Sequence, residues 1–204
     1  MPEVSLLLWD VGGVLLSNGW DEAARRAAMV RFGLNREEFE RRHRAVEDAF
    51  ETGQLGWEGY LAATVFYEPR PFSPEEFRAF MFEWSREHPA AIATARALRT
   101  RGEHVMAALN NESRDLNEYR IRTFGLTDVF HVFFSSCYTG RRKPDPDAFR
   151  YALQFLQREP EETLFLDDRP ENVAAAARLG LRTLLVRDPG RLSEELAGAG
   201  VVSG

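Results

Sequence analysis

The stretch LLLWDVGG, residues 6–13, joins a short apolar run to an acidic residue and a pair of glycines. Four consecutive apolar residues are typical of a strand that is buried on both faces of a sheet. Asp10 follows the run directly, and Gly12 and Gly13 indicate that a loop begins just beyond it. The stretch therefore predicts a buried strand whose carboxyl end presents an aspartate to a loop.

Strand and helix patterns alternate along the second half of the chain. We expect strands at residues 105–109, 129–137, 163–166 and 182–186, separated by helices at 114–124, 147–157 and 171–179. Short connections of this kind join parallel strands by right-handed crossovers. The sequence therefore predicts the α/β class, with a doubly wound parallel sheet that also contains the strand of residues 6–9.

A block of helices separates the first strand from this alternating region. Apolar residues at helical spacing predict helices at residues 21–32, 36–50, 57–67, 74–87 and 91–101. Asn35 and Ser73 stand at N-cap positions, and Pro74 suits the first position of a helix. The first four helices have no strand between them, which is typical of an inserted domain. We expect a core of residues 1–16 and 90–204 and a helical domain of residues 17–89.

Polar residues follow the expected strands at one edge of the sheet. In a doubly wound sheet the ligand lies beyond the carboxyl ends of the strands. The polar residues at or shortly after these ends are Asp10, Asn110, Asn111, Lys143, Asp167 and Asp168. Four separate segments of the chain therefore bring polar groups to the same edge.

These groups suit phosphoryl transfer when they act together. An aspartate at a strand end can attack phosphorus and form an aspartyl-phosphate, which divides one difficult displacement into two easier ones. Further carboxylates nearby would repel that nucleophile unless Mg²⁺, which prefers oxygen ligands, lay between them. A lysine and amide donors can offset the charge of the transferring group. Each residue alone has an ordinary explanation in a turn or a helix cap, so only their order along the chain and their shared placement at one edge indicate phosphoryl transfer.

Four short motifs resemble those of the haloacid dehalogenase superfamily, and they extend over most of the chain. The motifs are LWDVGGVL (8–15), LNN (109–111), KPDP (143–146) and LFLDDRPENV (164–173). The resemblance implies a Rossmann-like core, and the helical block is similar to the C1-type cap of that superfamily. The segment ETGQL (51–55), followed by Trp57, also resembles a recurrent part of such caps.

The resemblance implies a magnesium-dependent phosphatase with these residue roles. Asp10 would be the nucleophile and a metal ligand, and the backbone carbonyl of Gly12 would be another ligand. Asp168 would bind Mg²⁺ directly, and Asp167 directly or through water. Lys143 would bridge the nucleophile and the phosphate.

The phosphate would be bound further by Asn110 and Asn111, and here the chain departs from the family twice. Asn110 stands where the family has serine or threonine. Gly12 stands where its phosphatases usually carry an aspartate that protonates the leaving group and later activates water. A branch with glycine there acts on small metabolites such as hexose phosphates. We therefore expect a small phosphorylated substrate, a sugar phosphate among the candidates, and a preference for acidic leaving groups.

Two other functions remain open from the sequence. A 2-haloacid dehalogenase of the same superfamily would also lack the second aspartate and would need no metal, but it has little use for the adjacent carboxylates of Asp167 and Asp168. A protein that has lost turnover would instead bind a phosphorylated metabolite or a protein partner. Phosphate release with and without Mg²⁺ would separate these alternatives.

Composition excludes several other classes. The formal net charge of −6 argues against a nucleic-acid-binding protein. No apolar run is long enough to span a membrane and no basic leader precedes the first strand, so we expect a cytoplasmic protein. Cys137 is the single cysteine, which precludes an internal disulfide. We expect it to be a buried strand residue, with catalysis together with His131 as the weaker alternative.

Overall fold

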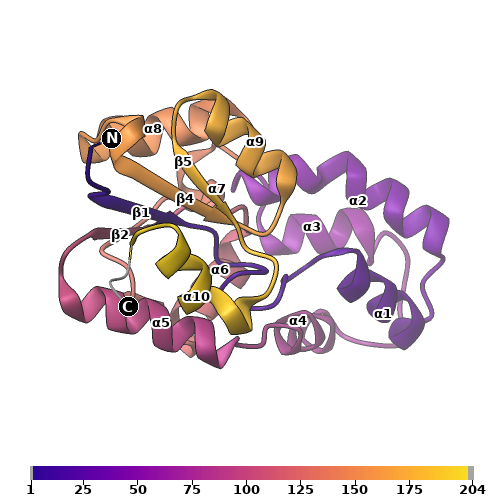
Figure 1. Cartoon of the computed structure of the whole chain (residues 1–204). Coiled ribbons are helices and arrows are strands. Elements are labelled where there is room, and N and C mark those ends of the chain that lie inside the picture. The colour runs from indigo at the N-terminus through magenta and orange to yellow at the C-terminus, as the bar shows by residue number, and fades with distance from the viewer. Residues whose placement is uncertain (1, 202–204) are drawn as a thin grey trace.

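The computed structural model describes residues 2–201. Its centre is a parallel sheet with the strand order β3-β2-β1-β4-β5, as Figure 1 shows. The strands are β1 (Leu6–Trp9), β2 (Val105–Ala108), β3 (Val132–Phe133), β4 (Thr163–Asp167) and β5 (Arg182–Leu185). The α/β class and the doubly wound parallel sheet expected from the sequence are confirmed.

The first strand is the middle of the sheet. In β1, Leu6 lies opposite Val105 of β2 on one side and opposite Thr163 of β4 on the other. This register brings the carboxyl ends of all three strands to the same edge. The residue that follows β1 therefore emerges between the residues that follow β2 and β4.

Helices cover both faces of the sheet. Leu7 and Trp9 of β1 point into one apolar cluster, and Leu6 and Leu8 point into the other, because successive side chains of a strand face opposite sides. The helices over the first cluster are α5 (Pro89–Arg101) and α10 (Leu192–Gly198), and those over the second are α8 (Pro146–Leu156) and α9 (Pro170–Arg178). Burial on both sides explains why β1 is an unbroken apolar run.

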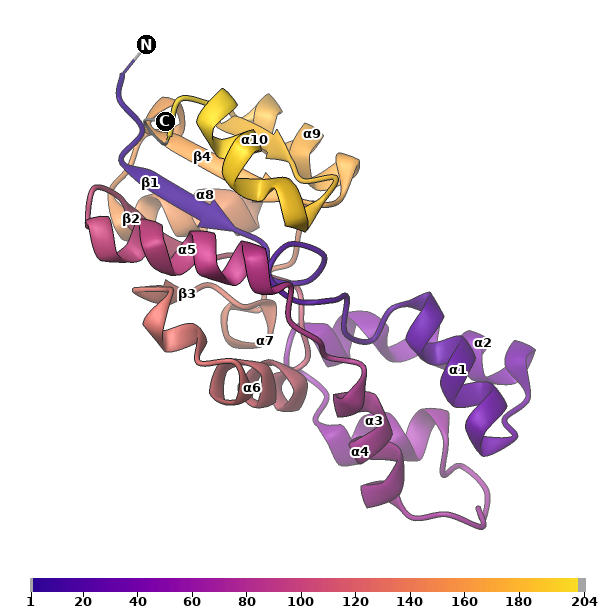
Figure 2. The same cartoon turned by 60° about the horizontal axis from the view of Figure 1, so that its bottom comes forward.

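The four helices between β1 and α5 form a separate layer at one end of the molecule, which is clearest in Figure 2. They are α1 (Glu22–Phe32), α2 (Arg36–Glu51), α3 (Trp57–Thr64) and α4 (Pro74–Glu83). They share an apolar cluster of their own, which includes Phe39, Tyr60 and Phe77. The expected caps are confirmed, since the side chain of Asn35 accepts a hydrogen bond from the Glu38 amide and Ser73 forms a capping box with Glu76.

Two chain segments connect these helices to the core, and they run side by side. The Ser17 amide donates to the Arg86 carbonyl at 2.7 Å, and the Ser17 hydroxyl donates to the Trp84 carbonyl at 2.7 Å. The His88 amide donates to the Leu15 carbonyl at 2.9 Å. The expected boundaries after residues 16 and 89 lie at or next to this pairing, and we keep them as a proposal.

The expected strand of residues 129–137 is wrong over most of its length, because β3 covers only Val132–Phe133. Beyond it, the Ser135 hydroxyl donates to Asn110 Oδ1 at 2.8 Å. The chain then turns into the short helix α7 (Ser136–Thr139). The bond from Ser135 to Asn110 joins residues 25 positions apart, and the start of α7 at Ser136 ends the extended segment. Cys137 is buried as expected, but in α7 and not in a strand.

Several helix ends also differ from the expectation. Helix α3 ends at Thr64, three residues before the expected end at 67, and the Thr64 hydroxyl bonds back to the Tyr60 carbonyl. Helix α4 ends at Glu83, because the residues that follow pair with the segment around Ser17. Helix α10 was not expected. Within residues 2–201, no helix combines the length and apolar character that crossing a membrane requires.

Candidate active site

The loop after β1 places Asp10 at the centre of the site. Its amide donates to the Leu166 carbonyl of β4 at 2.8 Å, and its Oδ1 atom accepts from the Val11 amide at 2.7 Å. Gly13 follows with φ 69°, and a Cβ atom there would lie 2.1 Å from Asp168 Oδ2. Only glycine combines this left-handed backbone with such a close approach. The glycine pair therefore lets the first loop lie directly against Asp168.

Three carboxylates come together beyond the ends of β1 and β4. Asp10, Asp167 and Asp168 each offer an oxygen atom, and these atoms all lie within 4.8 Å of one another. Burial raises the pKa of Asp10 to about 7; Lys143 acts in the opposite direction, and Asp167 and Asp168 raise it further. The cluster carries more negative charge than its surroundings neutralise.

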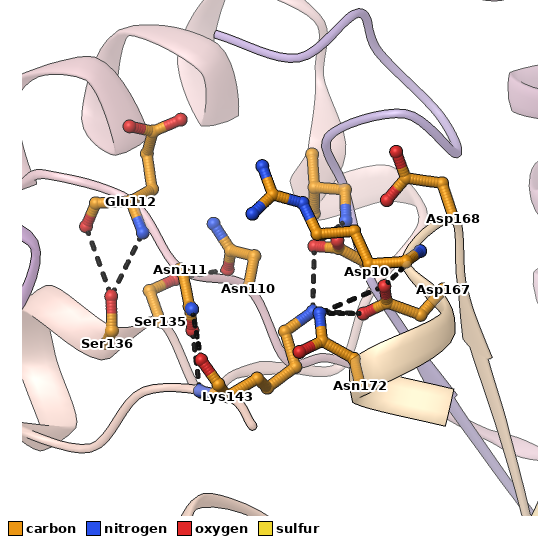
Figure 3. A network of polar contacts seen from close by, with 12 residues as sticks. Asp10, Asn110, Asn111, Glu112, Ser135, Ser136, Lys143, Asp167, Asp168 and Asn172 are labelled. Carbon is orange, nitrogen blue, oxygen red and sulfur yellow. Dashed lines mark hydrogen bonds and ion pairs between the residues drawn. The ribbon is translucent and has the colours of Figure 1, made fainter. Parts of the chain in front are cut away.

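Lys143 lies inside this cluster and is almost completely buried. Its Nζ atom is 2.6 Å from Asp167 Oδ2 and 3.1 Å from Asp10 Oδ1, as the dashed lines in Figure 3 show. Burial works against the charged ammonium, but the Coulombic attraction of Asp10 and Asp167 outweighs it and raises the pKa of Lys143. Lys143 therefore stays positively charged beside the carboxylate of Asp10.

The two adjacent aspartates have different surroundings. Asp167 has no exposed surface and accepts hydrogen bonds from Lys143 Nζ, Asn172 Nδ2 and the Arg169 amide. In Asp168, the Oδ2 atom accepts from Asn18 Nδ2 at 3.1 Å, whereas Oδ1 is buried without a hydrogen-bond partner among residues 2–201. A buried oxygen left without a partner is costly, so Asp168 Oδ1 is the oxygen that most needs a ligand, whereas both oxygens of Asp167 already accept hydrogen bonds.

The two asparagines after β2 hold neighbouring loops in place. Asn110 Nδ2 donates to Asn117 Oδ1 at 3.0 Å. Asn111 Nδ2 donates to the Lys143 carbonyl at 2.7 Å, and its Oδ1 accepts from the Lys143 amide at 2.9 Å. Each side-chain amide carries two N–H groups, so each retains one donor for a ligand. Asn111 also fixes the backbone from which the Lys143 side chain enters the cluster.

These residues border a cavity of about 280 Å³ between the sheet edge and the helical layer. Five of the positions expected at the site line it directly: Asp10, Gly12, Asn110, Asn111 and Lys143. Asp167 and Asp168 belong to the carboxylate cluster beside it. The structure thus brings together all the positions expected from the sequence, while their individual roles, including that of the Gly12 carbonyl, stay predictions.

Several residues that form the remaining walls were not expected from the sequence. The helical layer and the segment leading into it contribute Trp20, Arg25, Glu47 and Glu51, and the core contributes Glu112, Arg120, Arg142 and Arg169. Arg142 reaches across to α2, where its Nη2 atom lies 2.7 Å from Glu51 Oε2. Three lining residues could have been noticed, since Arg169 and Asn172 lie in the fourth motif and Glu51 begins the ETGQL segment. Nothing in the sequence pattern distinguishes the others from surface or packing residues.

Cys137 has no place in this chemistry. Burial raises the pKa of its thiol to about 12, and Glu112 raises it further. The thiol therefore stays protonated, whereas the thiolate is the reactive form. His131, the candidate base, instead accepts a hydrogen bond from the Met106 amide at 3.0 Å. Cys137 is therefore a structural residue.

The structure combines a parallel α/β sheet with an aspartate after its first strand, a buried lysine and two further aspartates at one edge. Comparison with known proteins identifies the family. Residues 4–180 match the family described as haloacid dehalogenase-like hydrolase. This chain belongs to that family, and it is an enzyme of the hydrolase class.

Two relatives that this chain matches differ in length and in the activity that their names give. The rat protein named bifunctional epoxide hydrolase 2 is 32% identical over 132 residues, which are 63% of this chain and 24% of the rat protein. The phosphoglycolate phosphatase of Aquifex aeolicus is 26% identical over 54% of each chain. This chain thus spans about a quarter to a half of these relatives.

Solved structures share the fold over a larger part of the chain. The HAD family enzyme bt-2542 of Bacteroides thetaiotaomicron, in complex with magnesium and inorganic phosphate, is 21% identical. The match covers 89% of this chain and 93% of that enzyme with a TM-score of 0.75. At this identity the likeness concerns the fold alone.

Proposed function

We propose that this enzyme is a magnesium-dependent phosphatase that hydrolyses a small phosphorylated metabolite through an aspartyl-phosphate on Asp10. The observation that carries the proposal is the cluster of three carboxylates around one buried lysine. A solved structure with the same fold that contains magnesium and phosphate, and a phosphatase among the relatives, support it.

The donor set fits Mg²⁺. Its ligands in proteins are oxygen atoms, and the three carboxylates offer such atoms within 4.8 Å of one another. Lys143 and Arg169 supply two positive charges against three carboxylates, so a net negative charge remains for a cation to neutralise. The unpartnered Oδ1 atom of Asp168 is the best available ligand atom. Asp10, the Gly12 carbonyl and Asp167, directly or through water, would complete the protein's contribution. When bound, Mg²⁺ would neutralise the carboxylates and draw charge from the phosphoryl oxygens.

The protein's own groups then have definite tasks. Asp10 attacks the phosphorus atom, so that a bond from its carboxylate oxygen to phosphorus forms while the bond to the leaving group breaks. Lys143 offsets the charge of the transferring group and of Asp10. The remaining N–H groups of Asn110 and Asn111 donate to phosphoryl oxygens. Water then cleaves the aspartyl-phosphate and restores Asp10.

The walls of the cavity favour a polar leaving group. Arg25, Glu47 and Glu51 line it from the helical layer, so the part of the substrate beyond the phosphate meets charged and hydrogen-bonding groups. A hydroxylated metabolite such as a sugar phosphate suits these surroundings. We keep the cytoplasmic location expected from the sequence as part of the proposal.

A panel of phosphorylated metabolites tests this function and separates it from the alternatives. We expect phosphate release from at least one sugar phosphate in the presence of Mg²⁺ and none in excess EDTA. Halide release from 2-chloropropionate without metal would favour the dehalogenase. Saturable binding of a metabolite, with no turnover of any substrate including p-nitrophenyl phosphate, would favour a protein that only binds the metabolite. The observation in favour of that alternative is Gly12, which stands in place of the usual proton donor.

A further inference from the structure

A buried glutamate faces the cavity close to the position where the proton donor is missing. Glu112 lies between β2 and α6 (Arg114–Thr123), is 7% exposed and lines the same cavity as Asp10. Its amide donates to the Ser136 hydroxyl at 2.9 Å, and its Oε1 atom accepts from the Ser113 amide at 3.1 Å. In Figure 3, Glu112 lies on the other side of Asn110 from the carboxylate cluster. The glutamate is therefore fixed at the wall opposite the metal side of the site.

The carboxyl group of Glu112 is held by Arg120. The Nη1 atom of Arg120 donates to Glu112 Oε2 at 2.9 Å, and its Nε atom donates to the Ser85 hydroxyl at 3.2 Å. Its Nη2 atom donates to the Ser17 carbonyl. Arg120 is thus fixed by both segments that connect the helical layer to the core, and it fixes Glu112 in turn.

The pair reaches the loop that contains Gly12. A Cβ atom at position 12 would lie 3.8 Å from Arg120 Nη1, and one at Gly19 would lie 2.9 Å from Glu112 Oε2. A side chain at position 12 would therefore begin between Asn18 and Arg120, the arginine that holds Glu112. The acidic group is supplied from a different strand end.

We propose that Glu112 donates the proton to the leaving group and later accepts one from the attacking water, which are the two tasks of the aspartate that Gly12 replaces. This inference rests on the proposed phosphatase function. Arg120 is a positioning residue, since it acts through Glu112.

Both steps balance with Glu112 alone. In the first, Asp10 bonds to phosphorus, the ester bond breaks, and the leaving oxygen takes the proton of the Glu112 carboxyl group, which becomes a carboxylate. In the second, water bonds to phosphorus, the bond from Asp10 to phosphorus breaks, and the water proton returns to Glu112. Each turnover ends with Glu112 protonated and Asp10 free.

The proton affinity of Glu112 suits this cycle. Burial raises its pKa to about 7; Arg120 acts in the opposite direction, and Glu51 and Asp10 raise it further. A group that must both donate and accept a proton works best with a pKa near the working pH.

The other acidic residues of the cavity have other contacts. Asp21 caps α1, where its Oδ1 atom accepts from the Ala24 amide at 2.8 Å, and Glu22 Oε1 accepts from Arg26 Nη2 at 2.6 Å. Glu51 and Glu47 both lie on α2 and face Arg142, at 2.7 and 4.0 Å. Glu51→Gln controls for the loss of a cavity carboxylate, because Glu51 is also paired with an arginine and burial also raises its pKa. Since Glu51 raises the pKa of Glu112, the comparison is made below pH 7, where Glu112 is protonated in wild type.

The test compares two substrates of the same shape, phenyl phosphate and p-nitrophenyl phosphate, in wild type, Glu112→Gln and Glu51→Gln. The ratio kcat/KM covers only the steps up to phosphoryl transfer, so a later slow step does not affect it. Phenoxide is the poorer leaving group and needs the proton more. We expect Glu112→Gln to lower kcat/KM about 100-fold for phenyl phosphate, the lower end for general acid catalysis, and only several-fold for p-nitrophenyl phosphate.

The second task gives an independent readout. Without a group to activate water, the aspartyl-phosphate should accumulate, so Glu112→Gln should release one equivalent of p-nitrophenol in a burst before slow turnover. Glu51→Gln should show neither the change in substrate ratio nor the burst. Equal losses for both substrates without a burst would overturn the inference.

Two further outcomes are informative. If Glu112→Gln does not fold, wild-type kcat/KM is measured over a series of aryl phosphates with leaving groups of different acidity. A shallow dependence of kcat/KM on this acidity supports a proton donor, and a steep dependence contradicts it. If wild type hydrolyses no phosphate ester with Mg²⁺ present, the proposed function fails and this inference with it. If wild type is active and Glu112→Gln has the same substrate ratio as wild type, the role of Glu112 is wrong, but the proposed phosphatase function still holds.

Discussion

The ammonium of Lys143 lies 2.6 Å from Asp167 Oδ2, and neither side chain has more than 1% of its surface exposed. Both charges are removed from water, so each needs polar partners nearby: Asp10 and Asp167 stabilise the ammonium, and Lys143, Asn172 and the Arg169 amide stabilise the carboxylate of Asp167. Removing one partner of such a buried pair costs about 3–5 kcal/mol, because the remaining charge is left uncompensated. The relationship makes Asp167 a structural support for the lysine as much as a candidate metal ligand.

The adjacent aspartates should therefore respond differently to substitution. We expect Asp168→Ala to weaken Mg²⁺ binding more than Asp167→Ala does, since Asp168 has the free ligand atom. Asp167→Ala should lower the free energy of unfolding by about 3 kcal/mol, whereas Asp168→Ala should change it little or increase it. Calorimetric titration of Mg²⁺ and urea unfolding measure the two effects. A larger loss of Mg²⁺ affinity in Asp167→Ala would reverse the assignment.

A side chain at position 12 should disturb the metal side of the site. A Cβ atom there would lie 3.0 Å from Asn18 Oδ1, and Asn18 donates to Asp168. We expect Gly12→Asp to displace Asn18 and to weaken Mg²⁺ binding several-fold, consistent with the loss of one hydrogen bond of about 1 kcal/mol. Calorimetric titration measures this, with Asn18→Ala as the matched control for the lost hydrogen bond.

The same substitution tests whether Glu112 already supplies the proton. Gly12→Asp should raise kcat/KM for phenyl phosphate in the Glu112→Gln variant and change it less than about tenfold in the otherwise unchanged enzyme. A large increase in both backgrounds would mean that the wild-type enzyme lacks a proton donor, as the sequence alone suggested.

The activity should depend on pH through Glu112. Its pKa of about 7 means that the carboxyl group is protonated below pH 7 and can donate, and that it loses this proton as the pH rises. The groups facing it are Arg120 on α6, Glu51 on α2 and Asp10 after β1. Above pH 7, where phosphate monoesters are already fully ionised, kcat/KM for phenyl phosphate should fall relative to that for p-nitrophenyl phosphate. This relative fall should be absent in Glu112→Gln.

Thiol reagents should leave the enzyme unaffected. The pKa of Cys137 is raised to about 12 by burial, so iodoacetamide at pH 8 should neither modify the native protein nor lower its activity. Mass spectrometry of the treated native protein checks this, with urea-unfolded protein as the positive control. Rapid modification of the native chain, or inactivation by it, would contradict the structural role of this residue.

The sequence predicted the elements that are specified locally. The strand of residues 6–9 and its neighbour at 163–166 are recognisable because strands buried on both faces are continuously apolar. The caps at Asn35 and Ser73 are recognisable because their side chains bond within one helical turn. The polar residues of the four motifs meet at one edge because parallel strands end on the same side.

The remaining features depend on contacts between distant segments. Where a strand was expected to continue to residue 137, α7 begins at Ser136, and Ser135 bonds to Asn110, which lies 25 positions away. Arg120 meets Ser17 across 103 positions. No local sequence pattern predicts that Glu112, which follows β2, lines the same cavity as Gly12. In the sequence alone, Glu112 is an ordinary acidic residue before a helix.

The central claim is that Asp10 is the nucleophile of a magnesium-dependent phosphatase, and one measurement tests it most directly. Phosphate release from p-nitrophenyl phosphate is followed for wild type and Asp10→Asn, each with Mg²⁺ and with excess EDTA. We expect release only from wild type with Mg²⁺, because the amide cannot attack phosphorus and because the carboxylate cluster needs the cation. Equal release in excess EDTA, or from Asp10→Asn with Mg²⁺, would contradict the claim.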